Sequence, residues 1–188
     1  MKKILLAAVV AFSSLAANAQ IWVGGSLGAN FKSVENGPKI SQFTISPEVG
    51  YTLNDKWDIA LAINTDLTSV EDADNTMSFS VEPYARYTFA KVGNVSFFLD
   101  GGFSFGTTNA VLSVNEKYEL ESSYVKAEDN TTTFTVGVRP GVKFAVNENL
   151  GLVAKLGWLG YKNVKDFGNE FGLNVSGAAL SFGAYYCF

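Results

Sequence analysis

The stretch QFTISPEVGYTLNDKWDIALAINTD, residues 42–66, contains two runs of alternating apolar and polar side chains, separated by the short segment LNDK. The apolar positions of the two runs are Phe43, Ile45, Pro47, Val49 and Tyr51, and then Trp57, Ile59, Leu61 and Ile63. A period of two is typical of a strand with two different faces, and Asn and Asp suit a tight turn. The stretch therefore predicts a β-hairpin with one apolar face and one polar face.

The same alternation recurs in both directions along the chain. It defines eight runs: residues 21–31, 42–52, 57–66, 77–89, 95–106, 134–144, 150–158 and 180–188. The connections alternate in length: LNDK, AKVGN and VNEN are short, whereas residues 32–41, 67–76, 107–130 and 162–175 are expected to form long loops. Short turns on one rim and long loops on the other are typical of membrane barrels. We therefore expect an all-β chain, folded as an eight-stranded antiparallel up-and-down β-barrel.

The direction of the apolar face decides between a membrane barrel and a soluble, lipocalin-like carrier, which is also an eight-stranded barrel. Most glycines within the runs fall on the polar face, and the narrow lumen of an eight-stranded barrel suits small residues. No charged residue falls on the apolar face of any run, and Arg or Lys facing lipid at mid-membrane costs about 2–4 kcal/mol. We therefore expect the apolar face to meet lipid, which makes the barrel a transmembrane one.

The charged residues of the polar face are then expected to point into the lumen. They are Glu48, Asp58, Asp66, Glu82, Arg86, Asp100, Arg139, Lys143 and Lys155. Because buried charges need partners, we interpret them as a paired ion network that closes the lumen. The alternatives are a narrow ion path and a catalytic cluster.

Aromatic residues of the apolar face gather near the short turns. Tyr51, Trp57, Tyr87 and Phe144 are placed there, together with Tyr186 and Phe188 of the last run. Amphipathic aromatic side chains form girdles at membrane–water interfaces. These residues therefore predict the aromatic girdle of one membrane interface.

The first 19 residues have the pattern of a secretory signal peptide: two lysines, an apolar run and the small-residue sequence Ala17-Asn18-Ala19. We expect cleavage after Ala19, which leaves one domain, residues 20–188. Without Lys2 and Lys3 the 14 basic residues fall to 12 against 18 acidic ones, a net charge of −6 that argues against nucleic acid as a partner. The single cysteine, Cys187, allows no internal disulfide and is interpreted as a small filler.

No later stretch has the roughly 18 consecutive apolar residues that a membrane-spanning helix needs, so strands must make any crossing. The last strand, ending in SFGAYYCF, must pair with the first so that no backbone edge is left in hydrocarbon. This ending resembles the C-terminal signal of bacterial outer-membrane barrels: Ser181, Gly183, Tyr186 and a terminal aromatic residue, Phe188. The resemblance implies the barrel-assembly machinery as a partner of the last strand.

The stretches ISPEVGY and LGWLGY are similar to those of the small outer-membrane β-barrel family that includes OmpX and the membrane domain of OmpA. The resemblance covers the whole expected mature chain. It implies a location in the bacterial outer membrane, with the lipid bilayer around the barrel.

The sequence offers little to catalysis, because it contains no histidine, the commonest general base and metal ligand. We expect no enzyme activity and no cofactor. Glu71, Asp72 and Asp74 could attract Ca²⁺, but their loop lacks the glycine and the final glutamate of an EF-hand, so a solvated acidic loop is expected and no metal site.

Function is therefore expected to be structural or carried by the long loops, through envelope integrity, adhesion or binding of a host factor. A narrow, porin-like ion channel is the alternative, and a secreted soluble carrier is a third.

Overall fold

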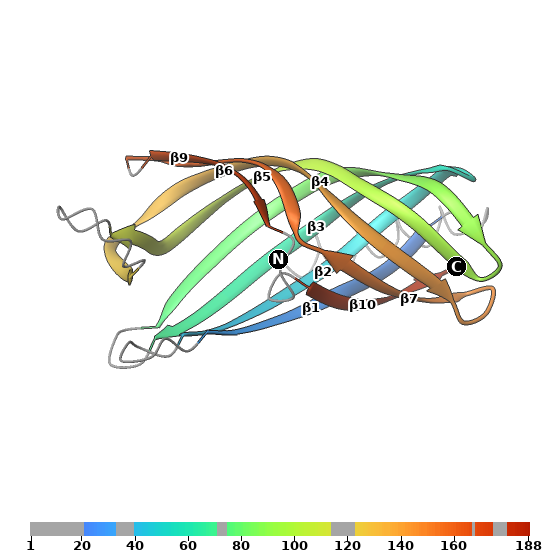
Figure 1. The fold of residues 1–188 in the computed structure, drawn as a ribbon, viewed down its shortest axis with the longest axis horizontal. Coiled ribbons are helices and arrows are strands. Elements are labelled where there is room, and N and C mark those ends of the chain that lie inside the picture. The colour runs from blue at the N-terminus through green and yellow to red at the C-terminus, as the bar shows by residue number, and fades with distance from the viewer. Residues whose placement is uncertain (1–20, 33–39, 71–74, 114–122, 167, 175–179) are drawn as a thin grey trace, which may run out of the picture.

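The structure is a computed structural model and describes residues 21–32, 40–70, 75–113, 123–166, 168–174 and 180–188. These residues form ten strand segments (Figure 1). Their bounds are β1 Ile21–Lys32, β2 Ile40–Asn54, β3 Trp57–Val70, β4 Thr76–Val92, β5 Val95–Ser113, β6 Ser123–Ala145, β7 Leu150–Leu156, β8 Trp158–Val164, β9 Gly168–Asn174 and β10 Leu180–Cys187. The expected signal peptide and the acidic loop at residues 71–74 lie outside the described ranges.

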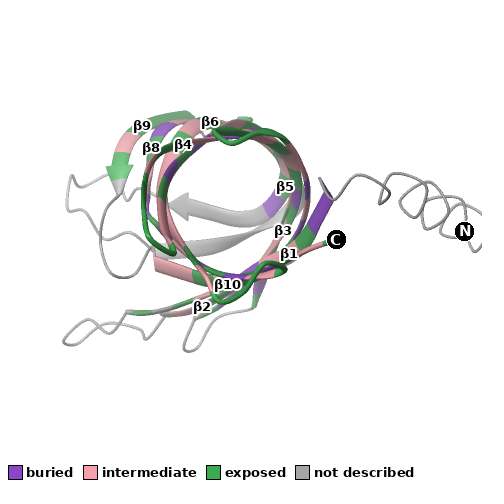
Figure 2. Ribbon diagram, turned by 90° about the vertical axis from the view of Figure 1, so that its right-hand side faces the viewer, coloured by how far each residue is buried: buried purple, intermediate pink, exposed green. Residues whose placement is uncertain are grey.

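The ten segments make a closed antiparallel barrel of eight strands, as expected from the sequence. We call each of these eight barrel strands a wall, because some of them consist of more than one segment. β7 and β8 form the seventh wall, and β9 and β10 belong to the eighth. β1 pairs with β10 from Trp22 opposite Cys187 to Gly28 opposite Ser181, which joins the two ends of the chain. Seen along its axis, the ribbon forms a ring (Figure 2).

The short turns lie at one end of the barrel, where the C-terminus also lies (Figure 1). They are residues 55–56, 93–94 and 146–149. The last residue is fixed there, since the Phe188 N–H donates to the Ile21 carbonyl at 3.1 Å. We call this the short-turn end and the opposite one the long-loop end.

At the long-loop end the strands extend further than the alternation predicted. The expected loop at residues 162–175 is wrong for most of its length, because β8 and β9 form a hairpin from Leu159 opposite Leu173 to Val164 opposite Gly168. β5 and β6 likewise continue their pairing to Ser113 opposite Ser123. Backbone pairing continues here although the side chains no longer alternate cleanly.

The two faces are as expected: large apolar side chains cover the outside. Phe103 and Leu152 are 43% and 48% exposed on the outer wall, whereas Phe98, on the opposite face of β5, is 1% exposed. On β2 the outward positions run from Phe43 to Leu53. Ten residue steps give about 33 Å at ~3.3 Å per residue, or about 25 Å of height at a tilt of about 40°, which matches the apolar band of outer-membrane barrels. No helix among the described residues is long and apolar enough to cross a membrane.

One irregularity reverses the alternation in the seventh wall. Gly157 separates β7 from β8 and has a φ of 58°, a left-handed conformation that favours glycine. The pairing partners of β6 show the insertion: Gly141 pairs with Lys155 of β7, and Val138 pairs with Leu159 of β8. Three residue steps on β6 therefore match four steps on the seventh wall. The extra residue exchanges the faces of β8.

The apolar side of the seventh run, residues 150–158, consists of its even-numbered positions, so the alternation predicts that Trp158 and Gly160 face lipid, and the exchange corrects this expectation. Leu159 faces outward and is 43% exposed. Trp158 and Gly160 point into the lumen instead, and the Trp158 ring lies against the backbone of Gly137 and Gly160.

Candidate functional site

The candidate site is a group of four buried charged side chains in the short-turn half of the lumen. Glu48 on β2, Arg86 on β4, Asp100 on β5 and Lys155 on β7 are only 2–4% exposed. Each lies at an inward position of its strand, and the barrel brings them together: Arg86 is directly opposite Asp100, and Lys155 lies close to both Glu48 and Asp100. We call these four residues the ion network.

Glu48 is the centre of the ion network. Its two carboxylate oxygens accept hydrogen bonds from Lys155 Nζ at 2.7 and 2.8 Å. The hydroxyls of Ser26 and Tyr185 donate to it at 3.1 and 2.9 Å, and the Tyr84 hydroxyl also donates to it. The carboxylate is thus fully surrounded by donors, as a buried charge must be.

Arg86 and Asp100 complete the ion network. Arg86 donates from Nε and Nη2 to the two oxygens of Asp100, at 2.6 and 2.8 Å, in the bidentate geometry that guanidinium and carboxylate groups favour. The Arg86 guanidinium also donates to the Tyr185 hydroxyl at 3.2 Å and lies 3.9 Å from the centre of the Phe98 ring. Lys155 Nζ is 3.6 Å from Asp100, which links the two ion pairs. Two acids and two bases give the ion network no net charge.

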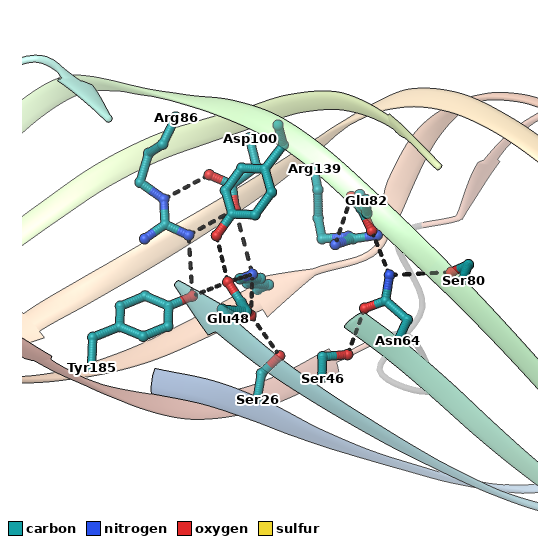
Figure 3. A network of polar contacts seen from close by, with 12 residues as sticks. Ser26, Ser46, Glu48, Asn64, Ser80, Glu82, Arg86, Asp100, Arg139 and Tyr185 are labelled. Atoms are coloured by element: carbon teal, nitrogen blue, oxygen red, sulfur yellow. Dashed lines mark hydrogen bonds and ion pairs between the residues drawn. The ribbon is translucent and has the colours of Figure 1, made fainter. Parts of the chain in front are cut away.

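A second ion pair lies beyond the ion network, toward the long-loop end. Arg139 Nη1 is 3.5 Å from Glu82, and the two side chains are 34% and 15% exposed. We call it the outer pair. Asn64 donates to Glu82 at 2.8 Å and accepts from the Ser46 hydroxyl at 2.7 Å (Figure 3). The outer pair therefore has a longer N–O distance than the two hydrogen-bonded ion pairs of the ion network and is more exposed to water.

Four aromatic rings fill the lumen around the ion network, and they were not among the site residues expected from the sequence. They are Trp22, Tyr84, Phe98 and Tyr185, each 6% exposed or less. Their common signal in the sequence is that each occupies the polar parity of its run.

Each of these rings lies directly opposite a glycine. The pairs are Trp22 with Gly50, Tyr185 with Gly24, Tyr84 with Gly102 and Phe98 with Gly141. A Cβ on Gly50 would come within 2.2 Å of the Trp22 ring. Small inward residues were correctly expected, but their role is to make room for large rings, which close the lumen together with the charges.

The structure brings together six of the nine charged residues expected in the lumen. They are Glu48, Arg86, Asp100 and Lys155 in the ion network, and Glu82 and Arg139 in the outer pair. Within the described ranges, Asp58, Asp66 and Lys143 form no ion pair. Asp66 accepts a hydrogen bond from the Thr44 hydroxyl at 2.5 Å instead. The fully paired network that the sequence suggested is therefore smaller in the structure.

The aromatic residues expected at the short-turn end lie on the outer wall there. Trp57 and Tyr87 are neighbours across β3 and β4, with ring centroids 4.7 Å apart, and Phe144 is 46% exposed. Tyr186 and Phe188 of the last wall face outward, and their ring centroids are 5.2 Å apart. Ser181 and Gly183 are inward residues of β10, opposite Gly28 and Ser26 of β1. Cys187 packs beneath the aromatic rings as a free thiol.

A cavity of about 540 Å³ occupies the long-loop half of the lumen. We call it the cup. Its floor includes Asp100 and the outer pair, and its walls carry mostly Ser, Thr, Asn and Gln side chains. It extends to Glu170, an exposed residue of β9, so water reaches it from the long-loop end. No group of three or more His, Cys, Asp or Glu residues in the described part of the chain is arranged to hold a metal ion.

A family model described as the outer membrane protein beta-barrel domain matches residues 4–188. The search of curated proteins gave no match. Among solved structures, the chain is similar to Neisserial surface protein A, with a TM-score of 0.57 and 20% identity over 89% of this chain and 97% of that one. It is also similar to the N-terminal β-barrel domain of OprF from Pseudomonas aeruginosa, with a TM-score of 0.51 and 16% identity over 90% of this chain and 98% of that one. At these identities the two structures share the fold with this chain.

Proposed function

The chain belongs to the outer membrane protein β-barrel family, and we propose that within the outer membrane it acts as a closed barrel, structurally or through its long loops. Membership places the apolar wall in the lipid bilayer. Because the short turns of outer-membrane barrels are periplasmic, we infer that the short-turn end lies on the periplasmic side. The long-loop end then faces the outside of the cell.

The observation that carries the proposal is the ion network across the lumen. Its four side chains are almost inaccessible to water, and the inward aromatic rings pack around them. An ion moving through the short-turn half would have to separate these pairs, and breaking one buried pair costs about 3–5 kcal/mol. The ion network therefore acts as a barrier to permeation rather than as a path.

A narrow ion channel is the second candidate, and the polar cup favours it. The cup already occupies the long-loop half of the lumen, and the ion network with the four inward aromatic rings separates it from the short-turn end. Rearrangement of Lys155 from Glu48 to Asp100, 3.6 Å away, would be the smallest movement that changes this barrier.

Planar-bilayer recordings distinguish the two candidates. The closed-barrel proposal expects no stable current steps from the wild-type protein. The double variant Glu48→Ser/Lys155→Ser, which removes both partners and much of their volume, should conduct and serves as the control that the assay detects a path through this lumen. Reproducible wild-type steps that change with Arg86→Met or Glu82→Gln would establish the channel instead.

The same proposal assigns no enzyme activity to the barrel. The chain has no histidine, and the carboxylates of the ion network are occupied by Lys155, Arg86 and hydroxyl donors. This leaves the surface at the long-loop end for contacts with a host factor or another cell. Replacing residues 114–122 by a short Gly-Ser turn should leave the heat-dependent gel mobility of the barrel unchanged and reduce adhesion of cells that display it.

We also propose that the barrel-assembly machinery recognises β10 and the residue after it, through Ser181, Gly183, Tyr186 and Phe188. Support comes from the position of β10, which closes the barrel by pairing with β1. A strand that forms the closing seam stays available to another protein until the last step of folding. Its aromatic end would be recognised before it reaches lipid.

A further inference from the structure

The cup has the size and the lining of a binding site for a small polar molecule. Its volume of about 540 Å³ lies within the roughly 300–1,000 Å³ of small-molecule sites. The side chains of Ser104, Thr133 and Thr135 line it, and within the described residues these three hydroxyls have no hydrogen-bond partner. The cup therefore offers unused donors and acceptors at several points of its wall.

The bulge at Gly157 supplies the cup with an aromatic surface. Without the inserted residue Trp158 would face lipid, as the sequence pattern predicted. Bulges often redirect a side chain next to a functional site. Here the Cε3 and Cζ3 atoms of the indole lie close to Gly137 and Gly160, and the ring lines the cup. Its N–H has no hydrogen-bond partner among the described residues.

The register places Trp158 next to the floor of the cup. Val138 is directly opposite Leu159, so the residues that adjoin them on the short-turn side, Arg139 and Trp158, are neighbours across β6 and β8. The Arg139 side chain is 34% exposed, and its guanidinium makes one ion contact, at 3.5 Å, with Glu82. An aromatic ring, a guanidinium with free donors and a carboxylate thus line the same cavity.

The charges of the cup favour a neutral ligand. Asp100 is neutralised by Arg86, which leaves Asp66, Glu82 and Glu170 against Arg139 and Lys162. A difference of one charge between acids and bases attracts neither cations nor anions strongly. The lining instead suits a molecule with many hydroxyl groups, since each hydroxyl both donates and accepts hydrogen bonds.

We propose that the cup binds a neutral saccharide, with one sugar ring against Trp158 and its hydroxyls bound by Arg139 and Glu82. A pyranose ring has an apolar face of C–H groups that packs on an aromatic ring, and a rim of hydroxyls for the polar partners. Asp66 adds an acceptor, because only one of its oxygens is used by Thr44. This site lies in the lumen and does not depend on the role proposed for the loops.

Saturation-transfer NMR with the purified barrel tests the proposal, in a zwitterionic detergent that carries no sugar headgroup. The probes are methyl α- and β-glucopyranoside, methyl α- and β-galactopyranoside, maltose and maltotetraose. At least one should receive magnetisation at its ring protons. Trp158→Ala should weaken its binding by roughly ten-fold, the upper end of what one stacked ring contributes. Trp57→Phe, on the lipid-facing wall, is the matched control and should leave binding unchanged.

Folding of each variant is checked by its heat-dependent gel mobility, and Trp158→Phe provides a second variant that keeps a ring in place. It should bind more tightly than Trp158→Ala and more weakly than wild type. Tighter binding of maltotetraose than of the methyl glycosides would indicate the end of a surface glycan as the source, and equal binding a free sugar. The proposal is overturned if no probe binds, or if Trp158→Ala and Trp158→Phe both bind like wild type.

Discussion

Removal of Lys155 is the most direct test of how the lumen is held closed. Lys155 Nζ lies 2.7 and 2.8 Å from the two oxygens of Glu48 and 3.6 Å from Asp100. Lys155→Met keeps most of the volume and removes the charge, so two buried carboxylates are left with the single guanidinium of Arg86. Loss of one partner of a buried pair destabilises a protein by about 3–5 kcal/mol.

A double-mutant cycle separates the interaction from the loss of each side chain. Glu48→Gln should cost less than Lys155→Met, because the amide oxygen still accepts from Lys155 and the tyrosine hydroxyls. The double variant removes both charges and leaves Arg86 with Asp100 undisturbed. Its cost should fall short of the sum of the single costs by about 0.5–3 kcal/mol, the range of coupling between residues in contact.

The assay is urea unfolding in lipid vesicles, followed by gel mobility without boiling and by tryptophan fluorescence. At about 2 kcal/mol per molar urea, a loss of 4 kcal/mol lowers the midpoint by about 2 M. Lys143→Met is the matched control: this inward lysine packs over Gly151 and has no ion-pair partner among the described residues, so its midpoint should move little. Additive single costs, or an equal effect of Lys155→Met and Lys143→Met, would refute the reasoning.

Three further predictions concern the outer wall, the lumen and assembly. Leu61→Arg puts a charge on the lipid-facing wall, where Leu61 is 40% exposed, and should destabilise the barrel by about 2–4 kcal/mol. Ala62→Ser changes a residue that faces the lumen and should be tolerated. Equal amounts of folded protein in membranes for the two variants would contradict the assignment of Leu61 to the lipid side. Gly102→Val places a Cβ 2.6 Å from the opposing tyrosine and should cost about 1–3 kcal/mol in urea unfolding, whereas Gly101→Ala, whose Cβ meets nothing within 4 Å, should not. Deletion of Phe188 should slow the appearance of folded barrel in pulse-labelled cells and leave refolding of the purified protein into detergent nearly unchanged; an equal loss in both would argue against recognition by the assembly machinery.

The sequence by itself determined the barrel and the direction of its faces. The two-residue period shows which residues share a face. The exclusion of charges from one face identifies the face that meets lipid. Glu48 and Leu61 could be placed inside and outside because strand alternation is a local property that needs no knowledge of partners. The alternating lengths of the connections gave the up-and-down order for the same reason.

Only the tertiary structure decided which inward residues meet. Glu48 and Lys155 are 107 positions apart, and their contact depends on the register and closure of the whole barrel. Among the residues that the structure describes, the same register leaves Lys143 without an ionic partner. It also places Trp22, Tyr84, Phe98 and Tyr185 over glycines on neighbouring strands. Trp158 shows the limit most clearly, because a single inserted residue with a positive φ exchanged its face, and a period of two carries no sign of such an insertion.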